Sequence, residues 1–184
     1  MLSVAFVRPE GMYGSIFNRI AAFVTRGRYC HCEIAVTWTV LEMRGFLTEV
    51  QGWQRLRNFE PFAHDGKVTI AFYVLYGTKV SFKFLSPMSL DRFYCNYDST
   101  WDVLPQRLSF ADQKRTVHFL LRQMQLGYDV AGAWLYWIPL RRTREKYPKY
   151  FCSQLVACAL NHTTNCLPNP ASLSPNGLYK QLLS

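Results

Sequence analysis

The chain has 184 residues, of which 49% are hydrophobic and 16% aromatic, and it carries a formal net charge of +9. This composition excludes an intrinsically disordered protein, and without a Gly/Ser- or Pro-rich linker it predicts a single domain over residues 1–184. No apolar run approaches the roughly 18 residues that span a bilayer. The N-terminal sequence also lacks a basic segment followed by a long apolar stretch, so we expect neither a transmembrane helix nor a signal peptide.

The N-terminal half is predicted to be rich in strands. Residues 2–7 indicate a short strand, and residues 13–25 indicate a helix that ends near Gly27. Four side chains of that helix are expected to face the core: Ile16, Ile20, Phe23 and Val24. Further strands are predicted at residues 29–36, 46–51, 68–75 and 79–84.

The C-terminal half is predicted to be mainly helical. Ser109 and Asp112 resemble a capping arrangement for a helix that closes near Gly127. Further helices are predicted over residues 131–138, from Cys152 onward, and after residues 174–177. Grouped strands flanked by helices indicate an α+β fold in which a mainly antiparallel sheet packs against helices.

The strand at residues 29–36 carries a candidate catalytic pair. Its alternation places His31 and Glu33 on one face, and Cys30 and Cys32 on the other. A cysteine nucleophile needs a base that a third group orients, and histidine beside a carboxylate is the usual solution. A core histidine satisfied by Glu33 is the simpler alternative when this strand is considered alone.

Cys152 is the candidate nucleophile. It lies in the first turn of a predicted helix, where unpaired backbone N–H groups and the positive end of the helix dipole favour a thiolate. The same N–H groups would stabilise an oxyanion on an attacked carbonyl. Structural packing is the alternative for Cys152 alone, because free cysteine is among the most buried residue types. Together with His31, the catalytic interpretation is favoured.

These two motifs resemble a known family. The His-x-Glu strand, followed much later by Phe-Cys-Ser-Gln-Leu-Val at residues 151–156, is similar to the circularly permuted NlpC-type, papain-like cysteine hydrolases. In the permuted group the histidine precedes the cysteine, as His31 precedes Cys152 here. The resemblance spans nearly the whole chain and is closest to members from poxviruses, other large DNA viruses and phages.

The resemblance implies a permuted papain-like fold and an activity. It implies a cysteine hydrolase or acyl-transfer enzyme that forms an acyl-enzyme on Cys152, with His31 as base and an amide, peptide or lipid ester as substrate. With no signal peptide, it also implies an intracellular protein, in the host cytoplasm or packaged in a virion. The competing hypothesis is a catalytically silent structural or virion-associated binding protein that retains the fold.

Two carboxylates compete to orient His31. Glu33 shares its strand face, whereas Glu49 would belong to the neighbouring strand, the usual home of the third polar residue in the family. If Arg44–Gly45 forms the hairpin tip, Glu49 lies out of reach, and if the chain turns near residues 39–40, Glu49 faces His31. Turn chemistry favours the glycine-containing tip, so Glu33 ranks first. A salt bridge from Glu33 to one of the nearby arginines, such as Arg26 or Arg28, is the structural alternative.

The resemblance also assigns a role to Tyr128. A tyrosine upstream of the nucleophile packs near the cysteine in the family, and Gly-Tyr-Asp at residues 127–129 is the matching stretch here. Its hydroxyl would supplement the helix-start N–H groups at the oxyanion position, where the substrate binds. An ordinary helix end followed by a packed aromatic residue is the alternative.

The six cysteines are expected to be free thiols, because no secretory signal accompanies them. Cys30-His31-Cys32 looks like a chelating cluster, but strand alternation points the imidazole away from both sulfurs. No second Cys/His pair lies at zinc-site spacing, so we expect neither a metal nor a cofactor.

The positive charge predicts an anionic partner. Five basic residues gather shortly before the nucleophile: Arg141, Arg142, Arg144, Lys146 and Lys149. Because they follow the aromatic stretch at residues 134–138, they favour contact with membrane headgroups or an acidic scaffold. A solvated loop beside a buried helix is the alternative. Sequence-specific nucleic-acid binding is not expected, since no recognition motif is present.

Overall fold

The structure is a computed structural model that describes residues 1–10, 16–24, 27–50, 52–75, 78–86, 100–129, 150–167 and 169–184. Its strands are β1 (Leu2–Val7), β2 (His31–Thr39), β3 (Lys67–Tyr73), β4 (Ser81–Phe84) and β5 (Trp101–Gln106). Its helices are α1 (Ile16–Val24), α2 (Val40–Glu49), α3 (Gln54–Arg57), α5 (Phe110–Arg122), α7 (Cys152–Thr164) and α8 (Pro175–Leu183), with short 3₁₀ turns at Glu60–Phe62 and Pro170–Ser172.

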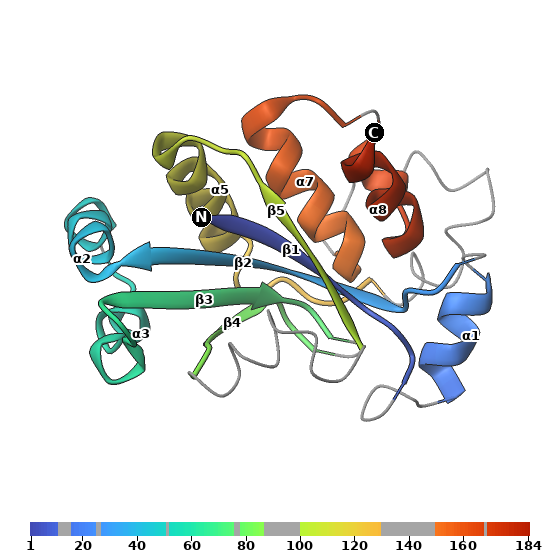
Figure 1. The fold of residues 1–184 in the computed structure, drawn as a ribbon, viewed down its shortest axis with the longest axis horizontal. Helices are drawn as coiled ribbons and strands as arrows, with labels where there is room; N and C mark the ends of the chain where they lie inside the picture. Colours follow the sequence, from blue (N-terminus) through green and yellow to red (C-terminus); the bar gives the residue numbers. More distant parts are fainter. Residues whose placement is uncertain are drawn as a thin grey trace.

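The five strands form one antiparallel sheet in the order β4-β3-β2-β1-β5, with β2 at its centre (Figure 1). This confirms the α+β class and the antiparallel sheet. The two sides of β2 are paired unequally. Its pairing with β1 continues to His31↔Val7, whereas its pairing with β3 begins only at Ile34↔Phe72. Residues 31–33 therefore extend past the region of β2 that β3 covers.

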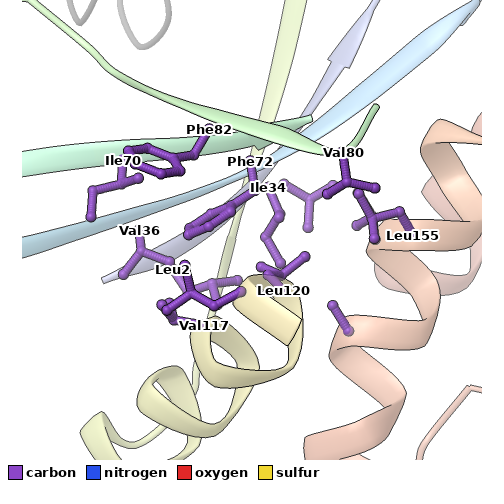
Figure 2. Close-up of a cluster of buried hydrophobic side chains, with 14 of the residues drawn as sticks. Leu2, Ile34, Val36, Ile70, Phe72, Val80, Phe82, Val117, Leu120 and Leu155 are labelled. Atoms are coloured by element: carbon purple, nitrogen blue, oxygen red, sulfur yellow. The ribbon is translucent and has the colours of Figure 1, made fainter. Parts of the chain in front are cut away.

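Helices α5 and α7 pack against one face of the sheet, and their apolar side chains meet those of the strands there (Figure 2). Ile34 and Phe72 from the sheet, Leu120 from α5 and Leu155 from α7 are all fully buried in this cluster. The opposite face carries small side chains: Ala35 of β2 pairs with Ala71 of β3, and Ala5 of β1, which pairs with Glu33, joins the same cluster.

Most of the predicted elements are confirmed. The strands at residues 2–7, 29–36, 68–75 and 79–84 correspond to β1, β2, β3 and β4. The Ser109 cap is present, because its side chain accepts a hydrogen bond from the Asp112 backbone N–H (3.1 Å) at the start of α5. The helix from Cys152 and the one after residues 174–177 are α7 and α8. The predicted helix at residues 131–138 lies outside the described residues.

The predicted strand at residues 46–51 is wrong, because this segment belongs to helix α2. Thr39 and Glu42 form a capping box: the Glu42 N–H donates to the Thr39 hydroxyl, and the Thr39 N–H donates to the Glu42 carboxylate. Once this cap starts the helix, Phe46 is buried on its inner face and Gly45 is an interior residue rather than a turn. The fifth strand is instead β5, from a segment for which the sequence predicted no element.

The orientation predicted for the first helix is also wrong. Ile16, Ile20 and Phe23 were expected to face the core, but they are 69%, 37% and 84% exposed, and among the described side chains of α1 only Ala22 is buried. The side chain of Val24, which was also expected to face the core, lies outside the described part of the structure. Helix α1 lies beside the end of the sheet rather than on one of its faces (Figure 1), so the sheet does not cover these three large apolar side chains. In the described residues, no helix is long and apolar enough to cross a membrane.

Candidate active site

Cys152 is the first residue of α7. The first intrahelical hydrogen bond runs from the Leu155 N–H to the Phe151 carbonyl (3.0 Å), so the N–H groups of residues 152–154 precede it. The helix start is also anchored from outside, because the Ser153 hydroxyl donates to the Leu173 carbonyl (2.7 Å). The backbone at Cys152 is therefore held in the geometry that directs several N–H groups toward one point.

The sulfur of Cys152 reaches β2 where that strand extends past β3. Both the thiol and the backbone of Cys32 hydrogen-bond to it, and the imidazole of His31 does so as well. The unequal pairing of β2 explains this contact, because the backbone of Cys32 lies in the stretch that β3 leaves uncovered. The structure thus brings the two predicted residues, Cys152 and His31, together.

His31 lies between the sulfur and a carboxylate. Its Nε2 atom is 3.5 Å from Oε1 of Glu33, an ion-pair distance without hydrogen-bond alignment. Burial by itself lowers the pKa of the imidazole, but attraction and hydrogen bonding to Cys152, together with the Glu33 carboxylate, raise the pKa of His31 to about 10. The imidazole is therefore protonated at neutral pH.

Glu33 is 1% exposed, and its partner is a lysine rather than an arginine. Nζ of Lys83 lies 3.1 Å from Oε2 of Glu33, and it also packs over the Tyr73 ring at 4.9 Å. Burial would raise the pKa of the Glu33 carboxyl, but His31 and Lys83 hold it below its usual value. Glu33 is therefore a carboxylate held between two cations, and Arg28 instead pairs with Asp102 at 3.4 Å.

The same contacts favour a thiolate at Cys152. The hydrogen bond from Cys32 lowers the pKa of Cys152 most, burial opposes it, and the positive charge of His31 lowers it further, so the pKa lies well below its usual value. The other two thiols behave in the opposite way. Burial raises the pKa of Cys30 to about 12 and raises that of Cys32 as well. Cys152 is thus set apart from its neighbours by its partners, not by its exposure.

Glu49 does not lie beside His31. It is the last residue of α2, and its carboxylate accepts a hydrogen bond from Lys114 of α5 at 2.6 Å. The alternative in which Glu49 faces His31 required Glu49 to lie on a strand beside β2, whereas Glu49 belongs to helix α2. Of the two carboxylates, only Glu33 is placed to orient the imidazole.

The backbone around Tyr128 pairs with the chain just before the nucleophile. Residues 127–129 pair with Tyr150, two residues before Cys152: the Asp129 N–H donates to the Tyr150 carbonyl at 3.0 Å, and the Tyr150 N–H donates to the Gly127 carbonyl at 3.3 Å. Tyr128 is partly buried and packs against the main core. Its role at the oxyanion position stays a prediction.

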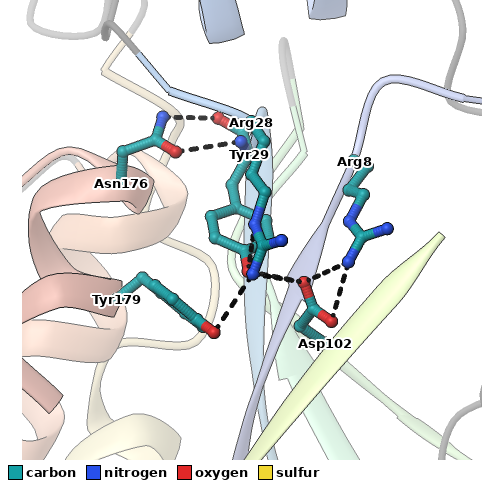
Figure 3. Close-up of polar contacts among 6 residues, drawn as sticks. All are labelled: Arg8, Arg28, Tyr29, Asp102, Asn176 and Tyr179. Atoms are coloured by element: carbon teal, nitrogen blue, oxygen red, sulfur yellow. Dashed lines mark hydrogen bonds and ion pairs between the residues drawn. The ribbon is translucent and has the colours of Figure 1, made fainter. Parts of the chain in front are cut away.

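Sequence reasoning missed Asn176, which connects α8 to the strand that carries His31. Its Oδ1 accepts from the Tyr29 N–H (2.9 Å), and its Nδ2 donates to the Tyr29 carbonyl (3.0 Å), as Figure 3 shows. Gly27 permits this approach, because a Cβ there would lie 2.2 Å from the Asn176 side chain. The Ser-Pro-Asn-Gly segment at residues 174–177 predicted a helix next to it, but it did not predict the contact of Asn176 with Tyr29.

A polar cluster next to this contact holds the Tyr29 side chain (Figure 3). Asp102 of β5 accepts hydrogen bonds from Arg8 at 2.8 Å and from the Tyr29 hydroxyl at 2.5 Å. Burial would raise the pKa of Asp102, but these two donors hold it below its usual value. The backbone that leads into His31 is therefore held from both α8 and β5.

Lys83 and Cys32 were also missed as site residues. Lys83 reaches Glu33 diagonally across β3, because it pairs with Ala71, which in turn pairs with Ala35. Strand order, which no local pattern reveals, decides this contact. In the described part of the chain, no group of three or more His, Cys, Asp or Glu residues is arranged to hold a metal ion. The basic cluster at residues 141–149 falls outside the described residues.

Comparison with known proteins finds no match: no family model, no curated protein and no solved structure matches this chain. The class that the geometry itself defines is an α+β protein with a buried Cys–His–Glu constellation at the end of a central strand.

Proposed function

We propose that the chain is a cysteine hydrolase or acyl-transfer enzyme of the permuted NlpC-type, papain-like group. The observation that supports this most strongly is the convergence of a helix-start cysteine, an imidazole and a buried carboxylate from segments more than 100 residues apart. The lowered pKa of Cys152 and the raised pKa of His31 favour a thiolate–imidazolium pair at neutral pH.

The mechanism follows from this pair. The Cys152 thiolate attacks the acyl carbonyl, and the N–H groups of residues 152–154 stabilise the oxyanion of the tetrahedral intermediate. His31 then donates its proton to the leaving amine or alcohol, and an acyl-enzyme remains on the sulfur. The neutral imidazole next takes a proton from the acceptor, which is water in hydrolysis or another nucleophile in acyl transfer. The acceptor bonds to the acyl carbon, the carbon–sulfur bond breaks, and the sulfur leaves as the thiolate, which restores the thiolate–imidazolium pair. Glu33 holds the imidazole in orientation throughout.

The proposed substrates are amides, peptides or lipid esters. All three present a carbonyl carbon to the sulfur and a leaving group that His31 can protonate. The chemistry of the site does not distinguish them, because none of its described residues is assigned to the group on either side of the carbonyl.

A catalytically silent binding protein is the second candidate, and the burial of the site favours it. Cys152 and His31 are only 5% and 7% exposed, so a substrate has little direct access to the sulfur. A buried ion pair that serves packing alone would have the same contacts as the active one.

Competitive alkylation of the six thiols by a small reagent at neutral pH separates the two candidates. Cys166 is exposed, whereas Cys158 lies on the same helix as Cys152 and burial raises the pKa of its thiol to about 11. If thiolate character controls labelling, Cys152 reacts before both. Labelling of Cys166 first, with Cys152 unreacted even in the presence of peptides or lipid esters, would exclude the enzyme. Cys152→Ala should abolish turnover, and Cys158→Ala is the matched control that retains it.

A further inference from the structure

Helix α1 turns large apolar side chains toward solvent, whereas an ordinary surface helix turns them toward the core. Ile16, Ile20 and Phe23 are spaced by four and three residues, so they form one stripe, and the stripe faces solvent. The covered side carries Ala22 instead. A surface helix normally buries its larger apolar residues, so this orientation leaves three large apolar side chains of α1 without cover.

This stripe differs from the other exposed apolar residues in the described part of the chain. The others lie singly on separate segments of the chain: Met1, Leu41, Phe62, Leu75, Phe110 and Leu183. Single exposed residues of this kind are ordinary on protein surfaces, whereas a contiguous apolar patch marks an interaction site. The stripe on α1 therefore indicates a partner.

The charge around the stripe selects the kind of partner. Between residues 11 and 32 the sequence contains three arginines and no acidic residue. Arg19 is exposed on α1 within one turn of all three stripe residues. Arg28 follows the helix, but its side chain pairs with Asp102 and with the Tyr179 hydroxyl. Two copies of this face would oppose like charges, which disfavours self-association. An apolar stripe beside an exposed arginine suits an anionic lipid surface, where the apolar residues enter the interface and the guanidinium group of Arg19 meets phosphates.

The place of α1 in the fold relates this surface to the candidate active site. Helix α1 lies beside the start of β2, the end of the sheet at which His31 is found (Figure 1). We propose that the exposed face of α1, formed by Ile16, Arg19, Ile20 and Phe23, docks the protein onto membranes that contain anionic lipids. This goes beyond the proposed hydrolase and does not depend on its activity.

Vesicle co-sedimentation tests the proposal, with phosphatidylcholine vesicles that contain or lack phosphatidylserine. The wild-type protein should bind the anionic vesicles and bind the neutral ones more weakly. Phe23→Ser should weaken binding about tenfold, because it removes a largely exposed aromatic ring that enters the interface. Arg19→Gln should weaken binding to anionic vesicles about fivefold and leave binding to neutral vesicles unchanged. Leu41→Ser is the matched control, since Leu41 is 78% exposed on α2, and it should bind as the wild type does.

Three outcomes would overturn the proposal. The first is no binding by a folded wild-type protein, as judged by circular dichroism. The second is equal loss of binding in Leu41→Ser and Phe23→Ser. The third is a wild-type dimer in sedimentation velocity that Phe23→Ser converts to a monomer, which would assign the stripe to a second copy of the chain. Cys152→Ala should bind vesicles normally, so failure of docking and failure of catalysis are separate results.

Discussion

Replacing Glu33 with Gln should lower the pKa of His31. The substitution removes a buried negative charge 3.5 Å from Nε2 and keeps nearly the same volume. At an effective dielectric constant of about 20, two unit charges at that distance attract by about 5 kcal/mol. Lys83 already neutralises part of this carboxylate from 3.1 Å, so the net effect is smaller. We expect the pKa of His31 to fall from about 10 by about one to three pH units.

The titration of the His31 ring proton, followed by NMR, measures this directly. Glu49→Gln is the matched control, because it makes the same chemical change at a carboxylate that pairs with Lys114 instead. An unchanged His31 midpoint in Glu33→Gln would refute the argument. A midpoint that moves in Glu49→Gln but not in Glu33→Gln would assign the orienting role to the other carboxylate.

Glu33→Gln should also change the stability of the folded protein, by an amount that depends on pH. The ordinary pKa of a histidine is 6.5, and that of His31 in the folded protein is about 10. Because the folded-state pKa is the higher one, the stabilisation is fully present below pH 6.5 and is lost as the pH rises through about 10. The free energy of unfolding in urea should therefore differ between the wild type and Glu33→Gln by a constant amount at pH 6 and up to the His31 midpoint of the mutant, and the difference should shrink between that midpoint and about pH 10.

Three further substitutions test the surroundings of the site. Lys83→Met should raise the pKa of His31, the opposite sign to Glu33→Gln, and the same NMR titration measures it. Cys32→Ala should slow alkylation of Cys152 about fivefold below neutral pH, since it removes a hydrogen bond of about 1 kcal/mol to the thiolate; an unchanged rate would mean that Cys32 does not stabilise the thiolate. Asn176→Ala should cost about 3 kcal/mol in urea unfolding, because two buried backbone groups lose their partner, and a loss below about 0.5 kcal/mol would show that water replaces it.

The sequence correctly predicted those helices and strands for which the local residue pattern and the packing in the fold favour the same structure. Alternation predicted four of the five strands, and the Ser109 cap predicted the start of α5. Helix α2 shows where two local signals compete. Arg44–Gly45 indicated a turn, while Thr39 and Glu42 formed a capping box that was not considered. The cap prevails because it satisfies two backbone groups at once, whereas a glycine only permits a turn without requiring it.

The orientation of α1 could not be predicted for a different reason. The periodicity of Ile16, Ile20 and Phe23 correctly predicts that they share one face, but periodicity cannot tell which side of the helix meets the protein. That choice depends on whether the core has a place for the helix. Here α5 and α7 already cover a face of the sheet, and α1 lies at its end (Figure 1).

The candidate site was predictable in its residues but not in its assembly. Cys152 and His31 each carry a local signal, yet their meeting depends on how far β3 extends along β2. If β3 paired with β2 beyond Ile34, it would occupy the edge where the backbone of Cys32 meets the Cys152 sulfur. The backbone hydrogen bond from Cys32, one of the contacts that lower the pKa of Cys152, would then go to a strand instead. A shorter β3 therefore leaves open the strand edge from which this bond is made, and the contacts of Asn176 and Asp102 with Tyr29 hold the backbone that leads into β2.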